Sequence, residues 1–121
     1  KGATIVVVKI KDSEKIVGGY NPLFWNSKKS DMSTRDSFLF SFTNRMNLQT
    51  AKVGYSNGNQ YSVYCYSTCE PTFGGAHDLR FYISGCLHRN YNSFSSYPRV
   101  DGMPAGQTKI DDYEVFQVTK K

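Results

Sequence analysis

Residues 71–83 read Pro-Thr-Phe-Gly-Gly-Ala-His-Asp-Leu-Arg-Phe-Tyr-Ile. A proline followed closely by two adjacent glycines is typical of a tight loop, because glycine adopts backbone conformations that other residues avoid. In the stretch after the loop, apolar residues occupy alternate positions, as in a strand with one buried side. Leu79, Phe81 and Ile83 are expected on that buried side. The segment therefore predicts two sheet segments joined by a loop whose backbone geometry, rather than side-chain chemistry, is specified.

Other strand signals lie at both ends of the chain. Thr4–Ile10 is an almost continuous apolar run, which favours a buried central strand that turns into a second strand at 15–17. In residues 113–118, apolar and polar side chains tend to alternate, and this stretch is expected to form the closing strand.

The middle of the chain also has strand patterns. Residues 37–42 place Phe38, Phe40 and Phe42 at alternate positions, so these rings are expected on one face of a strand. Asn57-Gly58 is a turn signal, and a strand is expected after it at 61–66.

Helical signals are weak throughout the sequence. No window of twelve residues holds a helical stripe, and only a short helical turn is expected at 47–52. Residues 84–107 are rich in Asn, Ser, Pro and Gly and are expected to be a long surface connection. We therefore predict a mainly β fold: a twisted antiparallel β-sandwich with few or short helices.

Length and hydropathy limit the class of protein. A chain of 121 residues is expected to form a single domain over 1–121 with a modest core. The mean hydropathy of −0.51 and the lack of a long apolar run exclude a transmembrane helix, so we expect no membrane insertion. The chain begins with Lys1 rather than Met and is interpreted as a segment of a longer protein.

The basic charge does not indicate nucleic-acid binding. The formal net charge is +5, but the Lys and Arg residues are dispersed along the chain and no RNA-binding signature is present. We therefore expect a solvated, mildly basic surface and no nucleic-acid partner.

The cysteine count favours a reducing compartment. Cys65, Cys69 and Cys86 make an odd number, whereas a secreted domain held by disulfides usually has an even one. Free thiols and a cytoplasmic location are the simpler interpretation.

Catalytic signatures are missing from the sequence. His77 and Asp78 are adjacent, but neighbours in an extended chain point to opposite faces and do not form a dyad. There is no Gly-x-Ser-x-Gly nucleophile elbow. Asp111 and Asp112 are interpreted as a solvated edge at the opening of a strand. We expect no catalytic residues.

A zinc site formed by Cys65, Cys69, Cys86 and His88 has a permissible set of ligands. If the chain is extended between Cys65 and Cys69, their Cα atoms lie about 13 Å apart, too far for two thiolates on one ion. The glycine doublets at 18–19 and 74–75 are not phosphate-binding patterns and are interpreted as close backbone approach or positive φ. We expect no cofactor and no metal.

Four ordered blocks resemble the TLDc family, the domain of oxidation-resistance proteins. They are the Gly-Gly-Tyr-x-x-x-x-Trp segment at 18–25, the strand at 36–41, the Pro-x-Phe-Gly-Gly-x-x-Asp-Leu loop at 71–79 and Glu-Val-Phe at 114–116. Together they cover about a hundred residues and resemble most closely the modules that follow BTB or kelch regions.

Two features depart from the family pattern. Glu70 and Ala76 stand where glycine is usual in the loop. Family members also have helical and strand segments upstream of the Thr4–Ile10 strand, so the chain resembles the C-terminal two-thirds of the domain and is expected to be a fragment. This predicts an exposed sheet edge, available for self-association or for an element supplied by a partner.

The resemblance implies a β-sandwich without established catalytic residues. It also implies protection from oxidative damage and binding to, and regulation of, the vacuolar proton-pumping ATPase. The positions that match the family signature are Gly18, Gly19, Trp25, Phe73, Gly74, Asp78 and Glu114. Turn geometry explains the glycines, core packing explains Trp25, and backbone hydrogen bonding explains Asp78 and Glu114.

Two other functions stay open. A thiol-based antioxidant enzyme would use Cys86, because His88 and Arg89 are close enough in sequence to lower the pKa of a thiol. A sugar-binding sandwich would use exposed Tyr and Trp, but the odd cysteine number and the missing signal peptide oppose it.

Overall fold

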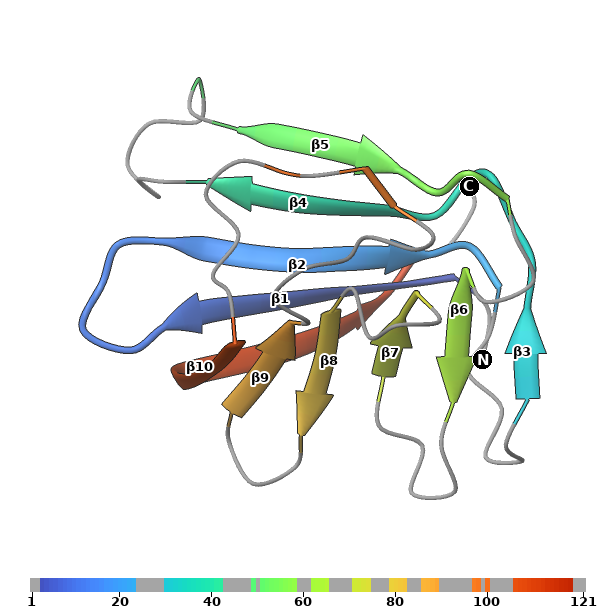
Figure 1. The fold of residues 1–121 in the computed structure, drawn as a ribbon. Coiled ribbons are helices and arrows are strands. Elements are labelled where there is room, and N and C mark those ends of the chain that lie inside the picture. The colour runs from blue at the N-terminus through green and yellow to red at the C-terminus, as the bar shows by residue number, and fades with distance from the viewer. Residues whose placement is uncertain are drawn as a thin grey trace.

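The structure is a computed structural model that describes residues 3–23, 30–42, 49, 51–58, 62–65, 71–74, 79–82, 86–89, 97–98, 100 and 106–118. Within these residues no helix is long and apolar enough to cross a membrane. The strands are β1 (Thr4–Ile10), β2 (Ile16–Asn21), β3 (Ser30–Met32), β4 (Phe38–Phe42), β5 (Lys52–Tyr55), β6 (Val63–Cys65), β7 (Pro71–Phe73), β8 (Leu79–Tyr82), β9 (Cys86–Arg89) and β10 (Gly106–Gln117) (Figure 1).

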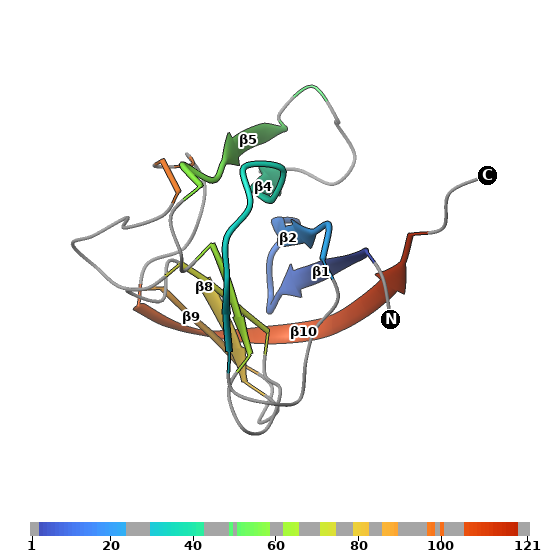
Figure 2. The same ribbon diagram turned by 90° about the vertical axis from the view of Figure 1, so that its right-hand side faces the viewer.

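The strands form one antiparallel sheet in the order β3-β6-β7-β8-β9-β10-β1-β2-β4-β5. The long strand β10 belongs to both halves: its first four residues pair with β9, and Ile110 and 112–117 pair with β1. Figure 2 shows β10 running from left to right across the view, with β8 and β9 at its left half and β1 and β2 above its right half. We call the half with β1, β2, β4 and β5 the β1 layer, and the half with β3 and β6 to β9 the β7 layer.

A β-bulge lies where β10 passes from one layer to the other. Lys9 pairs with Asp112 and Ile10 pairs with Ile110, so Asp111 is the extra residue in β10. Bulges bend a strand and increase its twist. Because Lys109 is the last residue of β10 that pairs with β9, the bend follows directly after the β7 layer ends.

The core lies between the two layers. On β1 the residues alternate strictly between buried and half-buried, so that Val6 and Val8 are completely buried. The β7 layer contributes Val63, Phe73 and Leu79, which are also completely buried. Burial of each such side chain contributes about 1.5–3 kcal/mol to folding, so apolar packing between the layers is the main stabilising term.

A buried tyrosine ties the layers together through hydrogen bonds. The Tyr97 hydroxyl contacts the Ser62 carbonyl and lies 2.7 Å from the Ser37 hydroxyl, and the Ser37 hydroxyl lies 2.7 Å from the Tyr20 carbonyl. The two hydroxyl protons are shared among these three contacts. The Tyr97 ring also packs edge-on against Phe73, with 6.1 Å between the ring centroids. One side chain therefore joins the start of β4, the start of β6 and the core of β7.

Several sequence predictions are confirmed. The fold is mainly β and antiparallel, with strands at 4–10, 38–42 and 63–65, and Leu79 is completely buried. Gly58 has a φ of 86°, but 59–61 lie outside the described residues and 56–58 form no regular turn, so the Asn57-Gly58 turn stays a prediction. It does not close a hairpin, because β5 pairs with β4 and β6 pairs with β3 and β7. Gln49 has a helical turn conformation, while 47, 48 and 50 lie outside the described residues.

Two predictions were wrong. Residues 84–107 are not one surface connection, because they contain β9, and Tyr97 and Val100 within them are only 2% and 4% exposed. Asp111 and Asp112 do not open a strand, because β10 starts at Gly106. β9 forms by pairing with its neighbour β8 and with β10, and Tyr97 is buried through its contacts with Ser37, Ser62 and Phe73. The start of β10 is held by its pairing with β9, which overrides the polar local sequence.

We predict that Tyr97→Phe destabilises the protein. The ring packing remains, but the Ser37 hydroxyl and the Ser62 carbonyl lose a buried partner, which costs about 1–3 kcal/mol. The measurement is the free energy of unfolding in urea. Tyr55→Phe is the control, because Tyr55 is 57% exposed, and its effect should stay within about 0.5 kcal/mol. An equal effect of both substitutions would contradict the structural role of the Tyr97 hydroxyl.

Candidate interaction surface

Gly19 of the β1 layer packs directly against the aromatic ring of Phe73 from the β7 layer. It lies on the core side of β2, opposite Val6 of β1 and Leu39 of β4. A β-carbon at Gly19 would lie only 2.6 Å from Cζ of Phe73. The Phe73 ring from the β7 layer therefore fills the space that a side chain at Gly19 would need. Two signature positions, distant in sequence, form one packing contact.

Gly18 has the corresponding role on the opposite side of the β1 layer, which we call the outer face. It pairs with Val7 of β1 and with Phe40 of β4. A β-carbon at Gly18 would lie 2.6 Å from Cζ of Phe40 and 1.9 Å from the carbonyl oxygen of Val6. The missing side chain lets the Phe40 ring lean over β2 toward β1.

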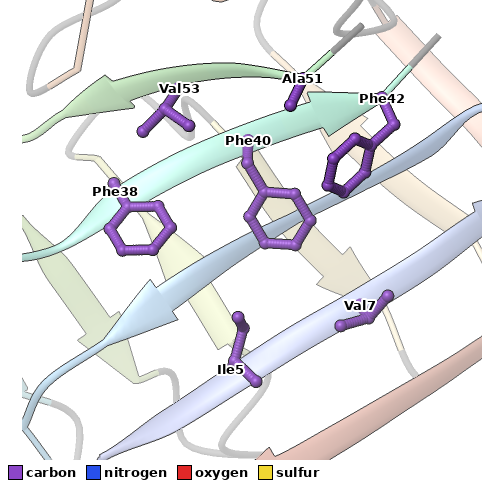
Figure 3. Close-up of a pocket in the computed structure, with 7 residues that line it drawn as sticks. All are labelled: Ile5, Val7, Phe38, Phe40, Phe42, Ala51 and Val53. Atoms are coloured by element: carbon purple, nitrogen blue, oxygen red, sulfur yellow. The ribbon is translucent and has the colours of Figure 1, made fainter. Parts of the chain in front are cut away.

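This arrangement leaves a hollow on the outer face with a volume of about 290 Å³. Ile5 and Val7 of β1 line one side of the hollow, and the three phenylalanines of β4 line its floor (Figure 3). Ala51 and Val53 complete the opposite side. We call this hollow the outer groove. Its lining residues are all apolar, and it spans the four strands of the β1 layer.

Aromatic rings extend the apolar surface along the outer face. Phe38 stacks on Tyr20 with 5.2 Å between ring centroids, and it lies at the same distance from the ring of Tyr55. Val53 and Tyr55 are 52% and 57% exposed on the edge strand β5. Phe38, Phe42, Ile5 and Val7 are half-buried and Phe40 is buried, so the exposed part of this apolar surface lies at β5. Exposed apolar patches are typical of sites where another protein or segment binds.

The predicted face of Phe38, Phe40 and Phe42 is confirmed, but its position was not predicted. The sequence predicted a shared face but not which side of the sheet it takes. Leu39 points to the core between the layers, whereas Phe40, on the outer face, is only 6% exposed, and Phe38 and Phe42 are half-buried. Ile5, Val7 and Val53 were also missed as surface residues. The alternation of β4 was visible in the sequence, but the choice of buried face needed the register to Gly18 and Gly19.

The other signature positions have separate explanations. Gly74 ends β7 with a φ of 89°, and its N–H donates to the Ser62 carbonyl at 3.3 Å, so turn geometry explains this glycine. Turn geometry does not explain Gly18 and Gly19, which lie inside β2. Glu114 is exposed on β10, opposite Val7. Trp25 and Asp78 lie outside the described residues.

The residues considered for chemistry are described only in part. Cys69 and His77 lie outside the described residues, as do the side chains of Cys65, Cys86, His88, Asp111 and Asp112. The strand order is informative nevertheless. Cys65 is in β6 and Cys86 in β9, three strands away, which places their Cα atoms about 14 Å apart. They are too far apart to bind the same zinc ion. No group of three or more metal-ligating residues occurs in the part of the chain that is described.

The fold and the surface define a class: a two-layer antiparallel β domain with an apolar outer groove. A family model for the TLDc domain matches residues 1–119, and the chain belongs to this family. The comparison with curated proteins found no match.

We predict that Gly18→Ala is far more destabilising than Gly54→Ala. A methyl group at Gly18 collides with the main-chain oxygen of Val6, which cannot move without breaking the β1–β2 ladder. At Gly54 the nearest atoms, at 2.8 and 2.9 Å, belong to the side chains of Val100 and Pro98, and these can shift.

The expected cost at Gly18 is about 3 kcal/mol or more, and the cost at Gly54 about 1–2 kcal/mol. Chemical denaturation of both variants measures the difference. Equal losses, or a Gly18→Ala variant as stable as the parent, would show that β1 and β2 are not packed as described.

Proposed function

We propose that this chain is a cytoplasmic, non-catalytic interaction module that binds and regulates the vacuolar proton-pumping ATPase and contributes to protection from oxidative damage. The observation that carries the proposal is the match to the TLDc family over residues 1–119. Its partner is a protein, and neither nucleic acid nor membrane insertion has a part in it.

The outer groove supports an interaction role and supplies the contact surface in this proposal. It is apolar throughout, lies next to the exposed Val53 and Tyr55, and has a rigid floor of mutually packed rings. Aromatic side chains on a rigid sheet lose little conformational entropy when they are covered, which favours their use as binding anchors.

The buried polar groups of the core fit a structural role. Ser56 lies 2.7 Å from Ser62 and Ser37 lies 2.7 Å from Tyr97, with each pair fully or nearly fully buried. The Ser56 hydroxyl also accepts from the Gly58 N–H at 3.0 Å. These hydroxyls satisfy backbone groups and one another, as buried polar groups in a scaffold do.

Binding to the ATPase is tested with Val53→Glu. This substitution puts a charge beside the outer groove, at a residue that is 52% exposed and so tolerant of change. We expect the parent chain to bind purified vacuolar ATPase and the Val53→Glu variant to bind at least about tenfold more weakly. Val118→Glu is the matched control, since Val118 is 45% exposed and is not among the residues that line the groove; it should bind as the parent does. Binding is measured by biolayer interferometry. Absence of binding by the parent, or equal binding by Val53→Glu, contradicts the proposal.

The thiol-enzyme alternative is tested by peroxide consumption. The strand register places Lys109 opposite Cys86, so a cation is available near this residue, and the alternative needs a direct assay. We expect neither the parent nor Cys86→Ser to consume more hydrogen peroxide than the stoichiometric oxidation of its own thiols, three in the parent and two in the variant. Catalytic turnover by the parent that is lost in Cys86→Ser would replace the proposed function with thiol chemistry.

A further inference from the structure

Asn57 is the only asparagine in the sequence that is followed by glycine. Asparagine is a thermolabile residue, and a following glycine has no side chain to shield the amide nitrogen between the two residues. The Asn57 residue is exposed and Gly58 is half-buried. The pair lies in the segment 56–58, which follows β5 of the β1 layer and precedes β6 of the β7 layer. A reaction at this pair would therefore act where the chain passes from one layer to the other.

Hydroxyl groups hold both main-chain groups of Gly58. The Gly58 N–H donates to the Ser56 hydroxyl at 3.0 Å, and the Gly58 carbonyl accepts from the Ser33 hydroxyl at 2.6 Å. The side chain of Arg35 also lies against this residue, since a β-carbon at Gly58 would be only 2.7 Å from Cγ of Arg35. The amide nitrogen that follows Asn57 is thus fixed by contacts with residues on either side of it.

Ser56, which holds this nitrogen, is itself anchored in both layers. It is 6% exposed, its N–H donates to the Ser37 carbonyl at 2.8 Å, and its hydroxyl lies 2.7 Å from the Ser62 hydroxyl. Ser37 precedes β4 and Ser62 precedes β6. Release of the Gly58 nitrogen therefore requires a local opening of the segment 56–58, and local openings of a native structure cost free energy.

We propose that Asn57 is a site of spontaneous conversion to isoaspartate, which the hydroxyls of Ser33 and Ser56 suppress while the segment 56–58 is in place. After the Gly58 nitrogen loses its proton to hydroxide, it attacks Cγ of Asn57. The N–Cγ bond forms, the Cγ–Nδ2 bond breaks, and the leaving nitrogen takes a proton from water and departs as ammonia. Water then attacks the main-chain carbonyl carbon of Asn57 and breaks its bond to the Gly58 nitrogen. The sum is one water consumed and one ammonia released, with no oxidant or reductant.

The product changes the main chain as well as the charge. Isoaspartate routes the chain through the former side chain, which adds a methylene group between positions 57 and 58 and leaves a free carboxylate. The Gly58 N–H and carbonyl then cannot both keep their bonds to Ser56 and Ser33. Because the ammonia is lost to solvent, a transient opening becomes a permanent one. The inference is independent of the proposed function, since it uses no residue of the outer groove and no partner.

The rate of conversion is measured on the full chain, incubated at mildly alkaline pH. Mass spectrometry with electron-transfer fragmentation distinguishes isoaspartate from aspartate and locates it at position 57. A blocked peptide with the sequence of residues 54–60 gives the rate without the fold. We expect the full chain to react at least about tenfold more slowly than the peptide, because opening of the segment must precede the attack.

Three serine variants locate the protecting groups. Ser33→Ala and Ser56→Ala each remove one bond to Gly58, and each should raise the rate about 2- to 10-fold. Ser13→Ala is the matched control, because the Ser13 hydroxyl accepts from the Lys15 N–H at 2.9 Å in the connection between β1 and β2. It removes a bond of the same kind at a distant place and should change the rate by less than about twofold. Ser33 is exposed, so Ser33→Ala decides the question if Ser56→Ala does not fold.

The structural consequence is measured by unfolding in urea. We expect the purified isoaspartate form to unfold at a lower urea concentration than the parent, and Asn57→Asp, which adds the charge without the methylene group, to unfold close to it. Three results would overturn the proposal: equal rates in the full chain and the peptide, Ser33→Ala and Ser56→Ala rates that match Ser13→Ala, and an isoaspartate form as stable as Asn57→Asp.

Discussion

The contact between Gly19 and Phe73 determines how the two layers of this protein meet. Phe73 is completely buried, and its ring occupies the position that a side chain at Gly19 would take. The same ring packs against Tyr97, whose hydroxyl reaches Ser37 and Ser62. A larger residue at Gly19 would push the β7 layer away from β2 and separate these hydrogen-bonding partners. The family signature at these positions is therefore a packing constraint.

The adjacent Gly18 has the same effect on the outer face of the β1 layer, where it leaves room for an aromatic ring. Because neighbouring residues in a strand face opposite sides, Gly19 admits Phe73 on the inside and Gly18 admits Phe40 on the outside. The outer groove lies along the row Val7, Gly18, Phe40 and Val53, which crosses four strands. Two adjacent glycines thus shape both the core and the apolar surface.

The sequence predicted those elements whose signal is local. The strand at Thr4–Ile10 has the predicted bounds because its apolar run is flanked by turn residues. The strand β10 begins well before the predicted start because Gly106 to Asp112 are held by pairing with β9 and β1 rather than by their own pattern. The burial of Tyr97 depends on hydroxyl and carbonyl partners 60 and 35 residues away. The outer groove needed the register among the four strands β1, β2, β4 and β5, which no local pattern contains.

The packing of Phe73 on Gly19 is measured most directly by NMR in solution. The account predicts nuclear Overhauser effects between the Gly19 α-protons and the Phe73 ring protons. It also predicts that the aromatic ring displaces the chemical shifts of these α-protons from their ordinary range. Gly19 α-protons with ordinary shifts and no such effects would show that the layers do not close at this point, and the arrangement of the core and the outer groove would have to be abandoned.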